Sequence, residues 1–206
     1  VPVEADGSAS FELPANRPVF FVALDENDLA VKRMQSFVSV MPGEVTSCLG
    51  CHENRTKSPA SVRPRSLMAT RRAPSRIERF EGIPDVLDYR RHIQPILARH
   101  CVRCHNARKY SGRTVLTGDL GYTWTIGWFT LFARGQIADG RNGFGNNPPR
   151  TIGTSASPLM KKIDGSHNKV KLSPKEWRTI WMYVESAAPY AGAYGALRTE
   201  DERKLV

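Results

Sequence analysis

The four cysteines of this chain all stand in two copies of one short pattern, Cys-x-x-Cys-His, and this pattern constrains the fold more than any other feature. The first copy is "SCLGCH" at 47–52, and the second is "HCVRCH" at 100–105. Two thiols three residues apart and an imidazole directly after them can all reach one bound group. Each copy therefore predicts a turn of chain wrapped around such a group.

Four chemistries use paired thiols. A structural zinc site needs two Cys-x-x-Cys knuckles, but residues 52–100 separate them here, whereas zinc ribbons have about 15–20 residues between knuckles. Zinc also gives no role to the His that follows each pair. A thioredoxin-like pair requires an α/β context that the sequence does not indicate. A disulfide within either motif would close a very small loop and stabilise little.

Haem c gives a role to all three residues of each copy. The two thiols add across the two vinyl groups of one haem, and the His binds the iron as proximal ligand. We therefore expect two covalently bound haem c groups, with iron ligands His52 and His105. The predicted thioether bonds come from Cys48, Cys51, Cys101 and Cys104.

The sixth ligand of the second haem is predicted to be His167. In a small cytochrome c the distal ligand lies in the loop before the last helix, and His167 lies in "DGSHNKVKLSPKEW", six residues before Ser173. Two alternatives stay open here. His167 could be an exposed loop residue, and Met160 could bind the same iron, although its position fits helix packing at least as well.

For the first haem the candidate distal ligands are His100 and His92. They are eight residues apart, so they share a face of a continuous helix. His100 is slightly favoured because it directly precedes Cys101, whereas His92 could be a core histidine bonded to a carbonyl. Two bis-histidine haems imply low-spin iron and electron transfer, while an open position on one iron would allow catalysis.

The expected fold is mainly α, a cytochrome c-like helical haem domain with a β-rich N-terminal segment that resembles the remnant of a small β-sandwich. Residues 1–42 contain Val- and Phe-rich stretches separated by turn clusters. Residues 43–82 hold the first motif and a basic connector. Residues 83–206 form the cytochrome c-like domain with the second haem.

Four helices are expected in the C-terminal part. The first leads into the second motif, with Pro95 marking a kink or a helix start; the others are expected at 121–135, at 156–163 and after Ser173. Ser157 and Ser173 are the predicted N-caps of the last two, each followed by Pro. Glu176 completes a capping box with Ser173, and an apolar stripe then runs along the last helix.

The formal charge is +10, and residues 55–79 hold eight Lys or Arg against one acidic residue, Glu78. These residues have no interleaved aromatics and no recognition motif, which argues against nucleic-acid binding. A solvated connector is the main interpretation; the alternative is a surface for haem propionates or an acidic redox partner. The most apolar run, Thr123–Ala133, is shorter than the roughly 20 residues of a membrane span.

The chain starts at Val1 without the features of a signal peptide, in the middle of a strand-like pattern. We therefore expect it to be part of a longer exported protein, or else to have lost its signal. Haem c is attached outside the cytoplasm in bacteria, and no thiol is left unused. We expect a location in the periplasm or at the extracellular side of the cell envelope.

Four segments carry a resemblance: "GEVTSCLGCHENR", "HIQPILARHCVRCH", "SASPLMKKIDGSHNKVKLSPKEW" and "ESAAPYAGAYGAL". They resemble the dihaem cytochrome c region of large exported planctomycete-type proteins and, more distantly, the haem-bearing C-terminal part of the hydrazine synthase alpha subunit. The likeness covers nearly the whole chain and implies a distal His at the position of His167. In the synthase a Tyr four residues after the first proximal His binds the catalytic haem, whereas here that position is Thr56.

The residues and the resemblance together favour an electron-transfer module rather than an enzyme. Its partner would be a redox protein or another domain of the same polypeptide. The alternative is a haem enzyme, a peroxidase or a converter of nitrogen compounds, with an open first haem. Thr56 weakens that alternative because it removes the synthase's ligand.

Overall fold

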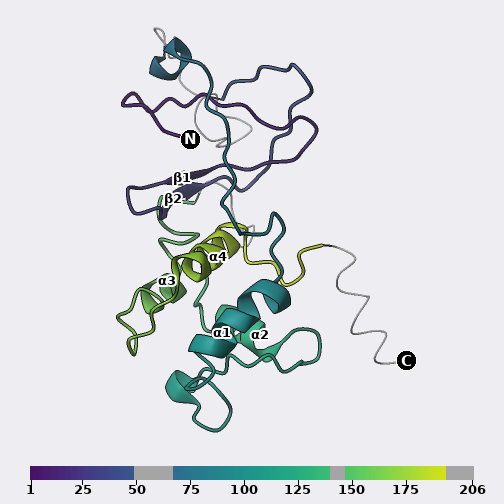
Figure 1. The fold of residues 1–206 in the computed structure, drawn as a ribbon, viewed down its shortest axis with the longest axis vertical. Helices are drawn as coiled ribbons and strands as arrows, with labels where there is room; N and C mark the ends of the chain where they lie inside the picture. Colours follow the sequence, from purple (N-terminus) through teal and green to yellow (C-terminus); the bar gives the residue numbers. More distant parts are fainter. Residues whose placement is uncertain (49–66, 140–146, 194–206) are drawn as a thin grey trace, which may run out of the picture. The chain divides into compact units, whose positions relative to one another are not determined.

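The computed structural model describes residues 1–48, 67–139 and 147–193 of the 206-residue chain (Figure 1). The described residues fall into two compact units. The first unit takes those of Val1–Phe21 and Met34–Glu81, and the second those of Val22–Arg33, Gly82–Gly143 and Asn147–Val206. Every α-helix of the described residues belongs to the second unit.

The first unit consists mostly of loops held together by isolated bridges. Val19 pairs with Val38 in antiparallel fashion, and Phe11 pairs with Ser75 in parallel. One 3-10 turn, η1, spans Met68–Arg71. The Phe-containing stretch 9–15 was expected to be a strand, but it contains Pro14, which cannot donate a ladder hydrogen bond, and it pairs only through the single bridge of Phe11. Of the expected strand 18–24, only Val22–Leu24 forms a strand.

The second unit contains the remaining elements. A π-helical turn, η2 (Tyr89–Ile93), runs directly into α1 (Gln94–His100), followed by η3 (Ser111–Arg113) and α2 (Ile126–Ala133). Helices α3 (Pro158–Lys162) and α4 (Pro174–Glu185) complete the helical part. Strands β1 (Val22–Leu24) and β2 (Ala30–Arg33) form a two-stranded antiparallel sheet.

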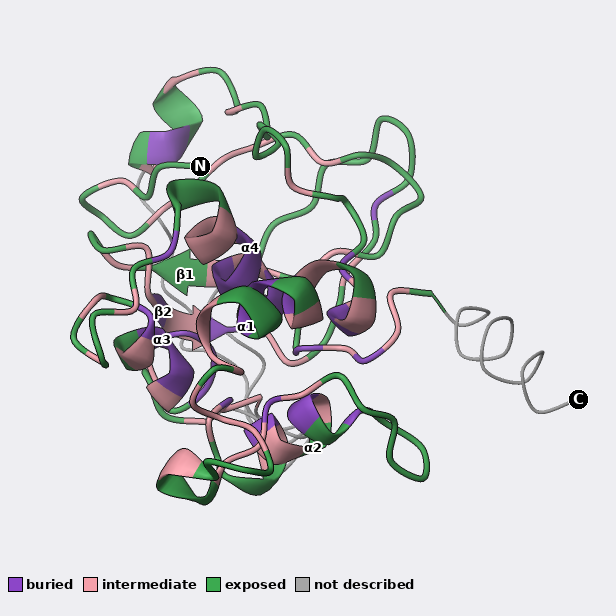
Figure 2. Ribbon diagram, turned by 60° about the horizontal axis from the view of Figure 1, so that its bottom comes forward, coloured by how far each residue is buried: buried purple, intermediate pink, exposed green. Residues whose placement is uncertain are grey.

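The core of the second unit lies between η2, α1 and α4. Tyr89, Ile93, Leu97, Ile180 and Val184 have no exposed surface, and Figure 2 shows buried residues on α1, α2, α3 and α4. The apolar stripe expected on the last helix is thus buried in protein. Burial of these apolar side chains stabilises the unit, because each Å² of apolar surface removed from water contributes about 25 cal/mol.

A buried arginine joins β2 to the end of α4. The guanidinium of Arg33 donates hydrogen bonds to the carbonyls of Val184 (3.1 Å), Glu185 (3.3 Å) and Asp139. The last carbonyls of a helix have no partner within the helix and carry partial negative charge, so a cation there is stabilising. This contact explains why the hairpin β1–β2 belongs to the helical unit.

The prediction of a mainly α, cytochrome c-like fold with a small β-sandwich remnant is wrong. Of the described residues 26% are helical and 9% are in strands or bridges, with four α-helices and one two-stranded sheet. The apolar stretch 121–135 yields a helix only over Ile126–Ala133, because the residues before it form a turn closed by the bridge between Leu120 and Thr125. Loops and turns therefore make up most of the described chain.

Candidate functional site

Helix α1 delivers the second Cys-x-x-Cys-His motif. The helix ends at His100, and the N–H groups of Cys101 and Val102 both donate to the carbonyl of Leu97, at 2.8 and 3.0 Å. The N–H groups of Cys104 and His105 then donate to the carbonyl of Cys101, at 3.0 and 2.9 Å. The motif is therefore one tight turn fixed at the end of a buried helix.

The ring of His105 is held by a backbone carbonyl. Its Nδ1 lies 3.0 Å from the carbonyl oxygen of Ser111, and because a carbonyl can only accept, Nδ1 carries the proton. The other nitrogen, Nε2, keeps its lone pair. Metal-binding histidines have this arrangement, in which the outer hydrogen bond fixes the tautomer and makes the ligating nitrogen more basic.

A left-handed turn brings Ser111 back to the motif. Tyr110 and Gly112 have φ of 44° and 58°, and Leu116 N–H donates to the carbonyl of His105 at 2.9 Å. Residues after the motif therefore fold back over it, which is how a carbonyl six positions along the chain reaches the imidazole.

His167 lies in a short loop between α3 and α4. The bridge between Asp164 and Lys171 closes this loop, and Ser166 fastens its first half by donating from N–H to Asp164 Oδ1 at 2.8 Å and from Oγ to the carbonyl of Lys161 at 3.0 Å. Asn168 then turns the chain with a φ of 49°. The half-buried His167 is thus presented by a closed turn.

The structure brings His105 and His167 together. Their ring centroids are 5.9 Å apart, and the ring planes differ by 23°. With metal–imidazole bonds of about 2.0–2.1 Å, two imidazoles that bind one ion from opposite sides have ring centroids about 6 Å apart, and the separation of these two stacked rings is of that size. The side-chain nitrogen of Asn168 lies 3.3 Å from Nε2 of His167. An amide nitrogen only donates, so this Nε2 is the acceptor, and it would exchange this bond for one to a metal ion.

The thiols of the second motif are free, and burial keeps that of Cys101 protonated. Burial, with a smaller contribution from Cys104, raises the pKa of Cys101 to about 11, and neither cysteine is in a disulfide. Zinc ligands must be thiolates, and redox-active cysteines have lowered pKa values. A thioether sulfur carries no charge, so burial does not oppose it. The raised pKa of Cys101 thus argues against a redox dithiol, and a thioether-bound group is compatible with the burial of this sulfur.

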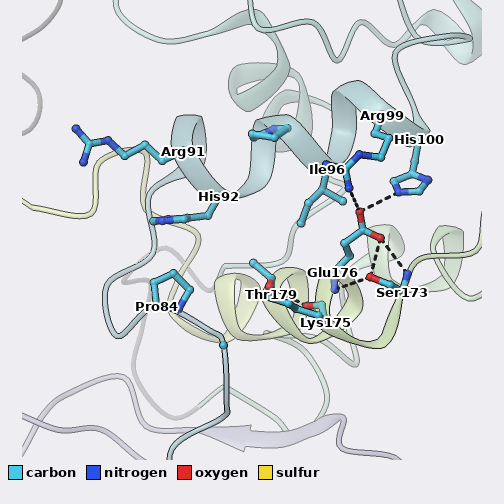
Figure 3. A pocket seen from close by; sticks show the side chains of 12 residues that line it. Pro84, Arg91, His92, Ile96, Arg99, His100, Ser173, Lys175, Glu176 and Thr179 are labelled. Carbon is cyan, nitrogen blue, oxygen red and sulfur yellow. Dashed lines mark hydrogen bonds and ion pairs between the residues drawn. The ribbon is translucent and has the colours of Figure 1, made fainter.

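His100 and His92 both line a pocket of about 600 Å³ between α1 and the start of α4 (Figure 3). Nε2 of His100 lies 3.1 Å from Glu176 Oε1, and a carboxylate only accepts, so this Nε2 carries a proton. Nδ1 of His92 accepts from the N–H of Asp88 at 2.9 Å, which also leaves the proton on Nε2. His92 is therefore bonded to a backbone N–H rather than to the carbonyl that the sequence suggested.

Glu176 has a second role that sequence reasoning missed. The capping box with Ser173 is present as predicted, and the same carboxylate also accepts from His100 and Arg99. Burial alone would raise the pKa of Glu176, but hydrogen bonds from Ser173 and His100 outweigh it and lower the pKa to about 2. The partners are 76 and 77 residues away in sequence, so no local spacing could have indicated them.

The remaining predicted residues lie elsewhere. Met160 on α3 is buried in the hydrophobic core. Cys48 is exposed with a free thiol, whereas Cys51, His52 and residues 55–66 of the basic connector lie outside the described residues. Within the residues that the structure describes, no group of three or more His, Cys, Asp or Glu side chains could hold a metal ion.

Comparison with known families gives one match. Residues 1–53 match the profile of the hydrazine synthase alpha subunit middle domain, which supports a distant relationship to that subunit for this quarter of the chain. The matched stretch ends just after the first Cys-x-x-Cys-His copy. Searches among curated proteins and among solved structures gave no match. Of the helices in the described ranges, none is long and apolar enough to cross a membrane.

Proposed function

We propose that this chain is a dihaem c-type cytochrome module for electron transfer. The observation that carries the proposal is the meeting of His105 and His167, each with a lone pair on Nε2 and with ring centroids 5.9 Å apart. Cys101 and Cys104 would hold the same haem by thioether bonds. When bound, the haem iron would supply a one-electron couple between Fe(III) and Fe(II).

The protein's own groups hold the two histidines that would bind the haem iron. Ser111 keeps the proton on Nδ1 of His105 and sets the ring orientation. The loop closed by Asp164 and Lys171 presents His167 as the second ligand. With both imidazoles in place, no coordination position is left for a substrate, which favours electron transfer over catalysis.

Apolar side chains flank both parts of this site. Cys101 and Val102 on the motif and Val170 near His167 are partly buried against the hydrophobic core. Such an apolar wall limits solvent access, and solvent access is one of the factors that set the potential of a haem.

The first haem is assigned to Cys48, Cys51 and His52. His100 and His92 are its candidate distal ligands, and either would have to exchange its present bond, to Glu176 or to Asp88, for one to iron. In this proposal the chain belongs to a larger exported protein in the periplasm or at the cell surface. It passes electrons to a redox protein or to other domains of the same polypeptide.

A second candidate is a haem enzyme that acts on nitrogen compounds or peroxide at an open first haem. The match of residues 1–53 with the hydrazine synthase alpha subunit favours it. Thr56, in the position of the synthase's Tyr ligand, argues against the synthase chemistry.

Removal of one thiol pair tests the haem assignment. Produced in a host that matures c-type haem, the Cys101→Ala/Cys104→Ala variant should keep about half of the covalent haem, since each pair attaches one group. The matched control is Cys48→Ala/Cys51→Ala, which should lose the other half. Denaturing gels stained for haem, with absorbance of the reduced pyridine complex, give the ratio. A colourless wild-type protein that contains zinc would overturn the proposal.

A further inference from the structure

Positive charge is concentrated on the two loops that carry His105 and His167. Residues 101–116 hold four cations and no acidic residue, and residues 161–171 hold four cations and one acidic residue, Asp164. Together these two segments carry a net charge of +7, and residues 55–79, of which 67–79 are described, carry another +7. The two loop segments together comprise 27 of the 206 residues of the chain.

The cations of the first segment lie close to the ring of His105. Arg103 precedes His105 by two residues and Arg108 follows it by three, so each is within about 12 Å along the chain at 3.8 Å per residue. Arg113 follows Ser111 by two residues, and the Ser111 carbonyl contacts the ring. Folding back of this loop thus keeps the backbone of these cations near His105.

The cations of the second segment lie around His167. Lys169 is two residues beyond it. The carbonyl of Lys161 accepts from Ser166, the neighbour of His167, and Lys171 closes the loop by bridging to Asp164. Since the ring centroids of His105 and His167 are 5.9 Å apart, the two loops meet at this pair, and the cations of these loops are called the basic rim.

These side chains are available to a partner. Seven of the eight cations are exposed and form no ion pair with any other described residue, namely Arg103, Arg108, Lys109, Arg113, Lys161, Lys169 and Lys171. The eighth, Lys162, donates to Gln136. Like charges gathered on one exposed surface repel one another, so they stabilise neither the loop nor the fold.

We infer that this basic rim is the docking surface for an acidic protein. Nucleic acid is disfavoured because a single-strand binder stacks bases on aromatics, and the two segments contain one aromatic residue, Tyr110. An anionic membrane is disfavoured because the cations stand on loops, not on one face of an amphipathic helix. That the docked protein exchanges electrons with the chain rests on the proposed function.

The physical effect of such a rim is steering. Clustered charge around a site raises association rates by about 10–1000-fold with an oppositely charged partner, and salt screens the effect within about 8 Å at physiological ionic strength. The surface would thus bring a partner's carboxylates to the His105 and His167 loops without a preformed apolar interface.

The test compares two variants of the haem-containing protein that have the same net charge. Lys109→Glu/Lys169→Glu changes the rim, and Arg17→Glu/Arg76→Glu changes two exposed cations of the first unit. Binding of soluble poly-L-glutamate is measured at several salt concentrations, with duplex DNA and phosphatidylserine vesicles as comparison ligands. The haem content of each sample is measured by absorbance.

The rim variant should bind poly-L-glutamate at least about tenfold more weakly at low salt, with a smaller salt dependence, while the control changes by about twofold. Equal weakening of both variants would overturn the inference, because net charge alone would then explain binding. If the wild type bound DNA or vesicles more tightly than poly-L-glutamate, and the rim variant lost that binding, the inference that the partner is a protein would be overturned. If the protein contained no haem, the proposed function would be refuted, but the comparison of the rim variant with the control variant would still test the docking surface.

Discussion

One hydrogen bond distinguishes His105 from His92. A backbone carbonyl accepts from Nδ1 of His105, and a backbone N–H donates to Nδ1 of His92. The free lone pair is therefore on Nε2 in the first residue, whereas Nε2 of the second holds a proton. The sequence predicted His105 as a proximal ligand and His92 as one of two candidate distal ligands, but it could not predict their tautomers, because these depend on Ser111 and Asp88.

Substitution of His167 tests whether this residue, together with His105, would bind the second haem iron. His167→Ala should leave the second iron with one protein ligand, so that reduced protein binds CO and one haem becomes high-spin. Absorption spectra with and without CO give the result. Asn168→Ala is the matched control, since it removes an exposed neighbour whose amide contacts the same ring. Unchanged spectra in His167→Ala would remove this residue from the site.

Helix ends were the best predicted elements. Ser173, Pro174 and Glu176 start α4 as the capping box indicated, and α3 begins at Pro158 after Ser157. These signals are local, so sequence suffices. The side chain of Ser157 nevertheless does not cap α3; it bonds Gly153 and Ala138 instead. Strands were overpredicted, because a Val-rich stretch forms a strand only where a partner strand is available.

The contacts of Glu176 predict a pH-dependent stability. Its pKa is about 2 in the folded chain, below the ordinary value of 4.5. The stabilisation is therefore complete above the ordinary pKa and is lost as the pH falls from about 5 towards 2. Glu176→Gln should lower the free energy of unfolding by about 1 kcal/mol at pH 7. Denaturant titrations across this pH range should show the two proteins converging.

Ser173→Ala is the companion variant. It removes the cap but keeps the carboxylate near His100, so it should cost about 1 kcal/mol at every pH above 5. If Glu176→Gln kept the full pH dependence of the wild type, other carboxylates would be responsible for it.

Gly127 in α2 should not tolerate a methyl group. Alanine normally stabilises a helix interior by about 0.5–1 kcal/mol over glycine. Here a Cβ would lie 2.6 Å from the hydroxyl of the fully buried Tyr89 and 2.9 Å from the carbonyl of Thr117. Gly127→Ala should therefore lower the free energy of unfolding by about 1–2 kcal/mol. Gly118→Ala, which meets only the flexible Gln94, should change it little; equal effects would refute this packing argument.

At the scale of the whole molecule, the architecture could not be predicted from the sequence, whereas the haem assignment stays a prediction. The Cys-x-x-Cys-His pattern indicates its bound group through covalent spacing alone. The fold depends on contacts distant in sequence, such as Arg33 with the end of α4, which joins the β-hairpin to the helices. The helices are short and the loops are long, so the sequence has little periodicity from which the architecture could be predicted. The mainly helical fold that was expected is not found.

The absorption spectrum of protein produced in a host that matures c-type haem tests the central proposal most directly. It is recorded oxidised, reduced, and reduced with CO. Two haems per chain and no change on addition of CO are predicted, since every iron would have two protein ligands. A CO-induced shift in half of the Soret band would contradict the closed electron-transfer module and favour an enzyme at the first haem. A colourless protein would contradict haem binding altogether.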